Sequence, residues 1–291
     1  MSTTIIRALE RKNHMKLIAI DLDGTLLSTD GNISQENKNA IYEAQKSGNI
    51  VVISSGRSLH DTRELLKQAE IDCPFITGNG AMTYYSGEVL QQFILPLKTL
   101  EKITETIEKY NLHYEIYTNE GILISEKRTY ILHNEIQQLN QQSAKEHATS
   151  MVNTQYSQHG IVYVSEFHSI DFAETDPYKV FVLSFKPDAL KALHDELAEM
   201  DDISLTAGSR EKLEIAHVNA SKGNGLKSIA DYFKVPLEDT VAVGDNLNDI
   251  SMFKTAVTGI AMENAEQEEK GYADFITKHH NNNGVAYALR K

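Results

Sequence analysis

A run of apolar residues that ends in two carboxylates sets the strongest limit on how this chain folds. Leu17 to Ile20 are all apolar, and Asp21-Leu22-Asp23-Gly24-Thr25 follows directly. A short apolar run that ends at turn residues is typical of a strand buried on both faces of a parallel sheet. The segment therefore predicts an α/β protein. It also places Asp21 and Asp23 at the carboxyl end of a strand, where ligands bind in open α/β sheets.

The spacing of these two acids indicates a cation site. Two carboxylates this close repel each other unless a cation or a shared proton lies between them. Mg²⁺ takes one or two carboxylates together with water and phosphate oxygens. The segment therefore predicts a Mg²⁺-dependent phosphoryl site, in which one carboxylate is free to act as a nucleophile. The plainer alternative is a strand that ends in an acidic turn, where Asp and Gly are common residues.

The pattern along the chain predicts two domains. Apolar strand-like runs alternate with helical periodicity from residue 17 to about 80, which indicates parallel strands joined by right-handed crossovers. From 85 to 214 strand-like and helical segments follow one another without this regular alternation, and the alternation returns after 214. We expect residues 15–84 and 215–291 to form a doubly wound parallel-sheet (Rossmann-like) core, and 85–214 an inserted α+β domain. Residues 134–158 are expected to form a helix plus loops, and residues 1–14 a disordered extension.

Composition narrows the classes of partner. The chain has 291 residues and a net charge of −13, which argues against a nucleic-acid surface because phosphate backbones need Lys and Arg to neutralise them. A small phosphate ester stays possible, since the field at a metal site is set by the ion and nearby bases. No apolar run approaches the ~20 residues that span a bilayer. Without a secretory signal either, the sequence predicts a cytoplasmic protein with no nucleic-acid or membrane partner. The single cysteine, Cys73, excludes an internal disulfide.

Three further segments follow the first acidic motif in a fixed order. A strand ends in Ser55 before Gly56-Arg57, Lys222 lies at the start of a helix, and Gly244-Asp245-Asn246-Leu247-Asn248-Asp249 follows another strand. Together, the four segments resemble the motifs of the haloacid dehalogenase superfamily of phosphotransferases. Thr77 to Ala81 is similar to a segment of its Cof-like branch. The insertion lies between the second and third motifs, which implies a cap domain of type IIB.

The resemblance implies a role for each matching residue. Asp21 would be the nucleophile, and Asp23 the general acid and base. Ser55 would donate its hydroxyl to a phosphoryl oxygen, and Lys222 would neutralise charge. The expected Mg²⁺ ligands are Asp21, Asp245, Asp249 and, through its backbone carbonyl, Asp23. The expected contacts to the substrate are Leu22, Gly56, Arg57, Asn79 and Asn248, with His113, Tyr114, Tyr117 and His168 as cap residues that could touch its organic part.

These expectations combine into a Mg²⁺-dependent phosphatase. It would hydrolyse small phosphate monoesters, either sugar phosphates or phosphorylated cofactors, through an aspartyl-phosphate, as a monomer or weak homo-oligomer. Two alternatives stay open: a phosphomutase or other phosphotransferase on the same site, and a non-catalytic phosphate-ligand sensor. A Rossmann-type cofactor binder would need Gly-x-Gly-x-x-Gly after the first strand, and this chain has none there.

Overall fold

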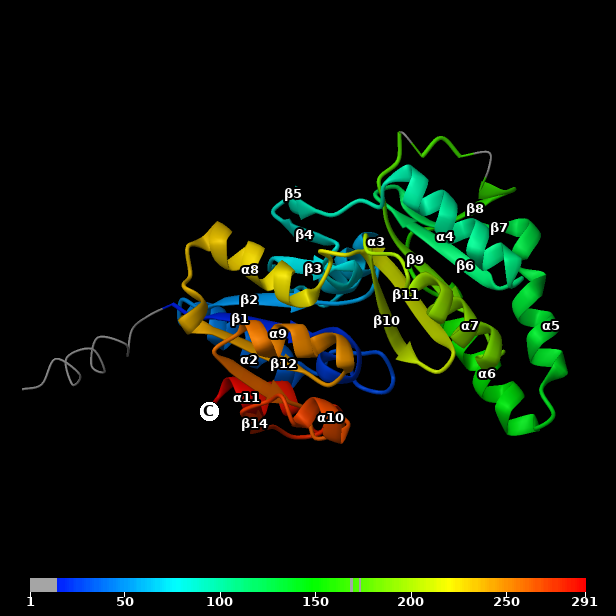
Figure 1. The fold of residues 1–291 in the computed structure, drawn as a ribbon. Helices are drawn as coiled ribbons and strands as arrows, with labels where there is room; N and C mark the ends of the chain where they lie inside the picture. Colours follow the sequence, from blue (N-terminus) through cyan, green and yellow to red (C-terminus); the bar gives the residue numbers. More distant parts are fainter. Residues whose placement is uncertain (1–14, 168–169, 173) are drawn as a thin grey trace, which may run out of the picture.

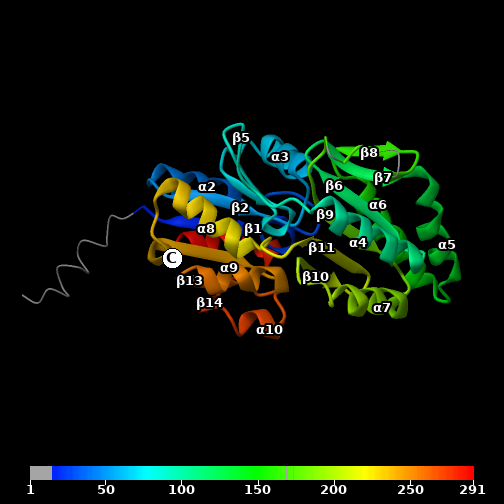
Figure 2. The same ribbon diagram turned by 45° about the horizontal axis from the view of Figure 1, so that its top comes forward.

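Two sheets organise the protein, each with its own helices (Figure 1). The computed structural model describes residues 15–167, 170–172 and 174–291. The expected extension, residues 1–14, lies outside them. Figures 1 and 2 show the two sheets side by side, with both ends of the described chain in the part built on the larger sheet. Among the described residues, no helix has the length and apolar character needed to cross a membrane.

The large sheet has eight strands in the order β14-β13-β12-β1-β2-β3-β4-β5. The strands from β14 to β3 run parallel, and β4 and β5 are antiparallel additions at one edge. In chain order the strands are β1 (Leu17–Asp21), β2 (Ile50–Ser54), β3 (Phe75–Thr77), β4 (Met82–Tyr85), β5 (Glu88–Gln92), β12 (Thr240–Gly244), β13 (Thr258–Ala261) and β14 (Phe275–Ile276). The helices are α2 (Gln35–Lys46), α3 (Leu59–Gln68), α8 (Lys222–Phe233), α9 (Ile250–Thr255), α10 (Gln267–Lys270) and α11 (Gly284–Leu289).

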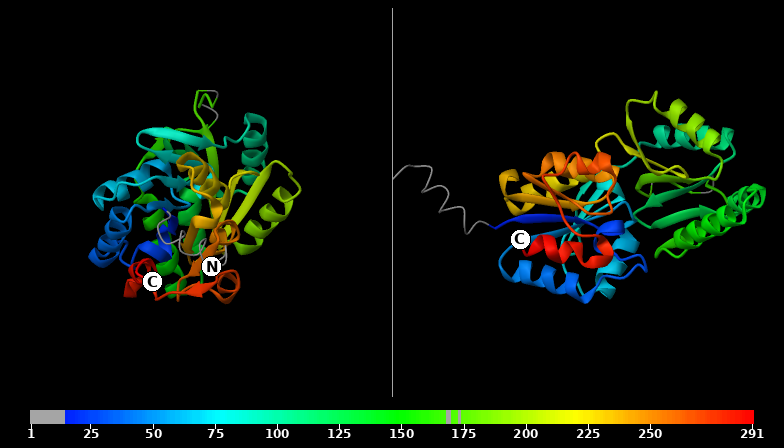
Figure 3. Two further views of the ribbon diagram at one scale, coloured as in Figure 1. Left: turned by 90° about the vertical axis from the view of Figure 1, so that its left-hand side faces the viewer. Right: turned by 90° about the horizontal axis from the view of Figure 1, so that it is seen from below.

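Helices cover both faces of this sheet. Leu17 and Ala19 pack with residues of α8 and α9, whereas Ile18 and Ile20 pack with residues of α2, α3 and α11. The right-hand view of Figure 3 shows α8 and α9 on one side of the sheet and α2 and α11 on the other. The apolar run before Asp21 is therefore buried on both faces, and the predicted doubly wound α/β fold is confirmed.

The small sheet has six strands in the order β10-β11-β9-β6-β7-β8, and all its pairs are antiparallel except β7 with β8. Helices α4 and α7 pack on one face of this sheet, and α6 packs on the other. Residues of that second face belong to the same hydrophobic cluster as residues of the large sheet and its helices. Residues 134–158 are thus mostly helical. The strands are β6 (His113–Thr118), β7 (Gly121–Ser125), β8 (Ile161–Val164), β9 (Pro177–Leu183), β10 (Ile203–Ser209) and β11 (Lys212–His217). The helices are α4 (Leu97–Lys109), α5 (Tyr130–Gln138), α6 (Gln142–Tyr156) and α7 (Pro187–Leu197).

The strand pairing moves both expected limits of the insertion. Limits at 85 and 214 would assign β5 to the insertion and the end of β11 to the core. Instead β5 extends the large sheet through a hairpin with β4, and all of β11 pairs within the small sheet. We therefore use "core" for residues 15–92 and 222–291, and "cap" for residues 97–217. Two short connections, 93–96 and 218–221, join them. Phe93, the first residue of one connection, stacks on His217, the last residue of the cap, with ring centroids 5.5 Å apart.

Candidate active site

The four motifs meet at one edge of the large sheet. Parallel strands β12, β1, β2 and β3 are neighbours, so their carboxyl ends lie in a row. Asp21 is the last residue of β1, Ser55 follows β2, Asn79 follows β3, and Asp245 follows β12. Lys222 is the first residue of α8, which begins there because the Ser221 hydroxyl accepts the N–H of Asn224 as an N-cap.

A buried lysine joins two of the carboxylates. Lys222 Nζ donates to Asp21 Oδ1 and, over 2.7 Å, to Asp249 Oδ1. All three side chains are at least nine-tenths buried. Burial opposes the charge of Lys222, but the ion pairs with Asp21 and Asp249 outweigh it and hold the pKa of Lys222 above its ordinary value. Burial, reinforced by the neighbouring charge of Asp249, raises the pKa of Asp21 well above its ordinary range despite Lys222.

Asp245 completes a cluster that fits a divalent cation. Asp21, Asp245 and Asp249 each offer one carboxylate oxygen, and the three oxygens lie within 4.8 Å of one another. Burial raises the pKa of Asp245 to about 6, and the charge of Asp249 adds to this effect. Three acids at such distances are unfavourable in the charged form. Hard oxygen ligands in this arrangement suit Mg²⁺.

Within the cluster, the three carboxylates differ in how much of their hydrogen-bonding capacity is used. Asp249 Oδ1 accepts from Lys222, and Oδ2 accepts the backbone N–H groups of Asp245 and Asn246 at 2.9 and 3.1 Å. Asp245 accepts from Thr25 Oγ1 at 2.6 Å and from Asn264 Nδ2 at 3.2 Å. Both oxygens of Asp249 are therefore occupied in holding Lys222 and the loop after β12 in place. Asp21 and Asp245 are the better candidates for direct ligands of a cation.

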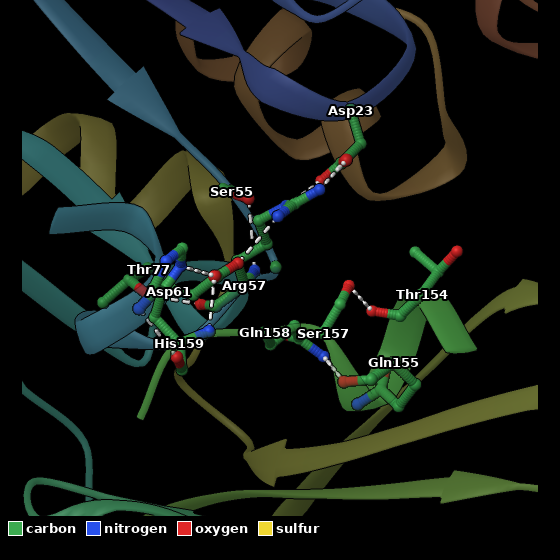
Figure 4. A network of polar contacts seen from close by, with 12 residues as sticks. Asp23, Ser55, Arg57, Asp61, Thr77, Thr154, Gln155, Ser157, Gln158 and His159 are labelled. Atoms are coloured by element: carbon green, nitrogen blue, oxygen red, sulfur yellow. Dashed lines mark hydrogen bonds and ion pairs between the residues drawn. The ribbon is translucent and has the colours of Figure 1, made fainter. Parts of the chain in front are cut away.

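The Asp23 side chain lies apart from this cluster. Both its oxygens accept from Arg57, from Nε at 2.8 Å and from Nη2 at 2.7 Å (Figure 4). The surrounding protein desolvates the carboxylate, but the hydrogen bonds with Arg57 outweigh this and hold the pKa of Asp23 below its ordinary value. The structure thus brings Asp21, Asp245 and Asp249 together but not the Asp23 carboxylate, because Arg57 binds it instead.

Arg57 also leads from this pair to the cap. Its Nη1 donates at 2.7 Å to Oδ2 of Asp61, which lies in the first turn of α3. Asp61 Oδ1 in turn accepts the backbone N–H of the cap residue His159 at 2.9 Å and lies 3.0 Å from its Nδ1. Figure 4 shows this row of side chains from Asp23 to His159. The proposed general acid and base is therefore connected to the cap through one guanidinium and one buried carboxylate.

The remaining predicted substrate contacts line the same edge. Ser55 is buried, and its Oγ accepts the N–H of Arg57 at 3.1 Å. Asn248 Nδ2 donates to Asn79 Oδ1 at 3.1 Å, and a Cβ on Gly56 would lie 2.7 Å from that same oxygen. The Leu22 side chain is fully buried in the hydrophobic core, so only its backbone is available to a substrate.

Three residues at the site were missed by the sequence reasoning. Asn264 bridges Asp245 and the Gly24 carbonyl, and no signal in its sequence context marks it. Lys179 and Glu214 reach the core from the cap strands β9 and β11. Lys179 is the one charged residue of β9, and Glu214 lies between Leu213 and Ile215 of β11. Charged residues among apolar ones in a strand are buried only when they are paired. That pattern could have indicated them.

The cap residues expected to touch a substrate are placed differently from one another. Tyr117 is buried and accepts from Gln155 Nε2 at 2.9 Å, and His113 is also fully buried. Tyr114 lies in the cluster of the opposite face and donates to Glu108 at 2.8 Å, so it faces away from the core and the expectation for it is wrong. His168 lies outside the described residues.

Comparison with known proteins identifies the family. Residues 18–289 match the family model described as haloacid dehalogenase-like hydrolase. Two relatives from Bacillus subtilis are each 34% identical: the phosphatase YwpJ, over 95% of this chain and 99% of its own, and the 5-amino-6-(5-phospho-D-ribitylamino)uracil phosphatase YwtE, over 94% and 97%.

The solved structures agree with the sequence relatives. A haloacid dehalogenase-like hydrolase from B. subtilis superposes with a TM-score of 0.82 at 33% identity, covering 95% of this chain and 99% of its own. TM0651 from Thermotoga maritima superposes with a TM-score of 0.78 at 26% identity, covering 95% of this chain and 97% of its own. The chain therefore belongs to the haloacid dehalogenase-like hydrolases, which confirms the family and the enzyme class, a phosphatase, expected from its four motifs.

Proposed function

We propose that this protein is a Mg²⁺-dependent phosphatase of small phosphate monoesters and that Asp21 is its nucleophile. One observation carries the proposal: Asp21 ends β1 in contact with the buried Lys222 and beside Asp245. Sugar phosphates and phosphorylated cofactors remain the proposed substrates. The name of the relative YwtE, which describes a phosphorylated ribityl compound, supports a polyhydroxylated leaving group.

In the first step, an Asp21 oxygen forms a bond to phosphorus as the bond from phosphorus to the ester oxygen breaks. Asp23 gives its proton to that leaving oxygen. In the second step, water bonds to phosphorus, the bond to Asp21 breaks, and Asp23 takes the proton of the attacking water. Lys222 neutralises Asp21 and the transferring group. Bound by Asp21 and Asp245, Mg²⁺ would supply positive charge to the phosphoryl oxygens.

Arg57 has to release Asp23 during this sequence. In the structure both oxygens of Asp23 accept from Arg57, which leaves the ionised carboxylate and no proton to donate. The phosphate of a substrate offers a guanidinium another bidentate partner. We therefore propose that Arg57 moves from Asp23 to the substrate phosphate, with Ser55 and Asn248 as further donors to the same group.

The proposal extends to the rest of the molecule. The core would carry out phosphoryl transfer, and the cap would cover the site and read the organic part of the substrate. We also propose that the protein acts in the cytoplasm, as a monomer or weak homo-oligomer. If the protein binds phosphate but releases none from any ester, the alternative of a non-catalytic phosphate-ligand sensor would be favoured. Transfer to a second hydroxyl would favour a phosphomutase or phosphotransferase.

The test is release of inorganic phosphate from a panel of phosphate esters, with Mg²⁺ and with EDTA. We expect activity with Mg²⁺, none with EDTA, and at least a ~10³-fold loss in Asp21→Asn, because the nucleophile acts as a unit with its partners. Asp231→Asn, at an exposed position of α8, is the matched control and should keep the wild-type rate. Full activity in EDTA would contradict the metal requirement, and Asp21→Asn above about a tenth of the wild-type rate would contradict the nucleophile.

A further inference from the structure

Two charged residues of the cap enter the phosphate-binding edge of the core. Lys179 on β9 and Glu214 on β11 lie on neighbouring strands, and Lys179 Nζ donates to Glu214 Oε1 at 3.0 Å. The lysine side chain is 1% exposed and the glutamate side chain 17% exposed. Lys179 Nζ also lies 4.1 Å from the centre of the Tyr117 ring. This ion pair is thus built into the inner face of the cap sheet.

Each member of the pair has one partner in the core. Lys179 Nζ donates to the carbonyl oxygen of Gly56, the residue directly after Ser55, at 2.5 Å. Glu214 Oε2 accepts from Asn79 Nδ2. If the cap moved away, Lys179 and Glu214 would stay together on their sheet, but both contacts with the core would be lost.

The contact with Asn79 fixes the direction of an amide at the site. A carboxylate only accepts hydrogen bonds, so Glu214 holds the Asn79 NH₂ group towards the cap. The Asn79 oxygen then faces Asn248 and accepts from its Nδ2 at 3.1 Å. Asn248 follows Asp245 by three residues. A chain of two hydrogen bonds therefore runs from a cap carboxylate to the fourth motif.

We propose that Glu214 and Lys179 are positioning residues that complete the phosphate-binding end of the core when the cap closes. Glu214 acts through Asn79 on Asn248, and Lys179 acts through the Gly56 carbonyl on the turn that carries Ser55. This inference rests on the proposed phosphatase function. Because both residues act on the phosphate end, which every substrate shares, their effect is the same for all esters.

Other contacts hold the cap to the core without this pair. The Leu59 N–H donates to Tyr178 Oη at 3.1 Å, and Asp61 accepts from His159. His60 Nε2 lies 2.8 Å from the Asn119 carbonyl. Loss of the Glu214 carboxylate should therefore leave the cap attached to the core. A change in turnover then reports on the orientation of the Asn79 and Asn248 amides.

The first experiment compares Glu214→Gln with wild type on several esters that differ in their organic part. We expect kcat to fall by about tenfold or more, by the same factor for every ester, because Gln has one acceptor oxygen in place of two and cannot accept from both Lys179 and Asn79. Glu196→Gln removes an exposed cap carboxylate that pairs with Lys109 and should leave all rates unchanged. Rates that stay at the wild-type level, or losses that depend on the ester, would overturn the inference.

A double-mutant cycle tests the route through Asn79. If Glu214 acts through this amide, Glu214→Gln should have no further effect on kcat in an Asn79→Ala background. Losses that multiply would overturn the route. Should Glu214→Gln fail to fold because Lys179 loses its partner, the Lys179→Met/Glu214→Met variant removes both charges and the acceptor for Asn79. It is expected to show the same uniform loss, and wild-type rates or ester-dependent losses in it would overturn the inference. A wild-type protein inactive on every ester would instead contradict the proposed function.

Discussion

Lys222 contacts two acids at once, and this explains how several carboxylates are buried at a single sheet edge. One N–H of the Lys222 ammonium group donates to Asp21 and neutralises it, and another donates to Asp249. The second oxygen of Asp249 accepts the backbone N–H of Asp245, just after β12. The sequence predicted that acids gather here, because strand ends in a parallel sheet are neighbours. It could not predict that Arg57, 34 residues away, takes Asp23, since that choice depends on how the loops after β1 and β2 pack.

At the residue scale we predict that Asp245→Asn stabilises the metal-free protein. The Asp245 carboxyl of the unfolded chain loses its proton near its ordinary pKa of 3.8, whereas burial lets the folded protein keep it up to about pH 6. Folding therefore binds a proton in this window, and stability falls as the pH rises through it. This costs as much as about 3 kcal/mol at neutral pH. In EDTA at pH 7.5, thermal unfolding of Asp245→Asn should show a Tm as much as about 5 °C above wild type, since unfolding entropy is about 2.1 cal/mol/K per residue.

Two controls accompany this prediction. The gain should shrink as the pH falls towards 4, because the Asp245 carboxyl of the unfolded wild-type chain then also begins to take up the proton. Added Mg²⁺ should raise the Tm of wild type but not that of the variant, since a ligand that binds only the folded state stabilises it. A variant less stable than wild type in EDTA at both pH values would show that Asp245 carries no such cost.

At the scale of elements, the turn after β3 supports the start of α8. Gly80 has a φ of +94°, and a Cβ there would lie 1.9 Å from the carbonyl oxygen of Ser221, the residue before Lys222. We expect Gly80→Ala to lower the free energy of unfolding by more than about 3 kcal/mol, because backbone has to move to make room. Denaturant unfolding measures the loss, and the folded variant should also lose activity as Lys222 shifts.

Gly87 provides the matched control for backbone conformation. Its φ is +91°, and a Cβ there would meet no atom within 4 Å. Gly87→Ala should therefore cost only the strain of a left-handed residue, about 1–2 kcal/mol. Equal losses in the two variants would show that conformational strain, and not the close approach to α8, explains the effect of Gly80→Ala.

The elements that the sequence did not predict are short or depend on distant partners. Strand β8 has four partly exposed residues at the edge of the small sheet, too few for a periodic signal beside the polar α6. Helix α11 has six residues and begins after Asn283 in a left-handed conformation. The attachment of β5 to the large sheet was not expected either, since the sheet that a strand joins depends on partners distant in the sequence.

At the scale of the whole molecule, the family and the site were readable because four short motifs each combine a strand or helix end with a chemical group. The contacts between cap and core could not be predicted, because they depend on how the two sheets meet in space. Lys179 and Glu214 are the clearest example: each meets its core partner across more than 100 residues of sequence, 123 to Gly56 and 135 to Asn79.

The most direct test of the account is to locate the phosphoryl group on the enzyme. Asp23→Asn, incubated with Mg²⁺ and an aryl phosphate whose leaving group needs no proton, should complete the first step and stall before the second. After acid quench and digestion, mass spectrometry should find one phosphoryl group, on Asp21, that neutral hydroxylamine removes. A phosphoryl group on another residue would contradict the central claim, as would hydrolysis of the same ester by Asp21→Asn at the wild-type rate.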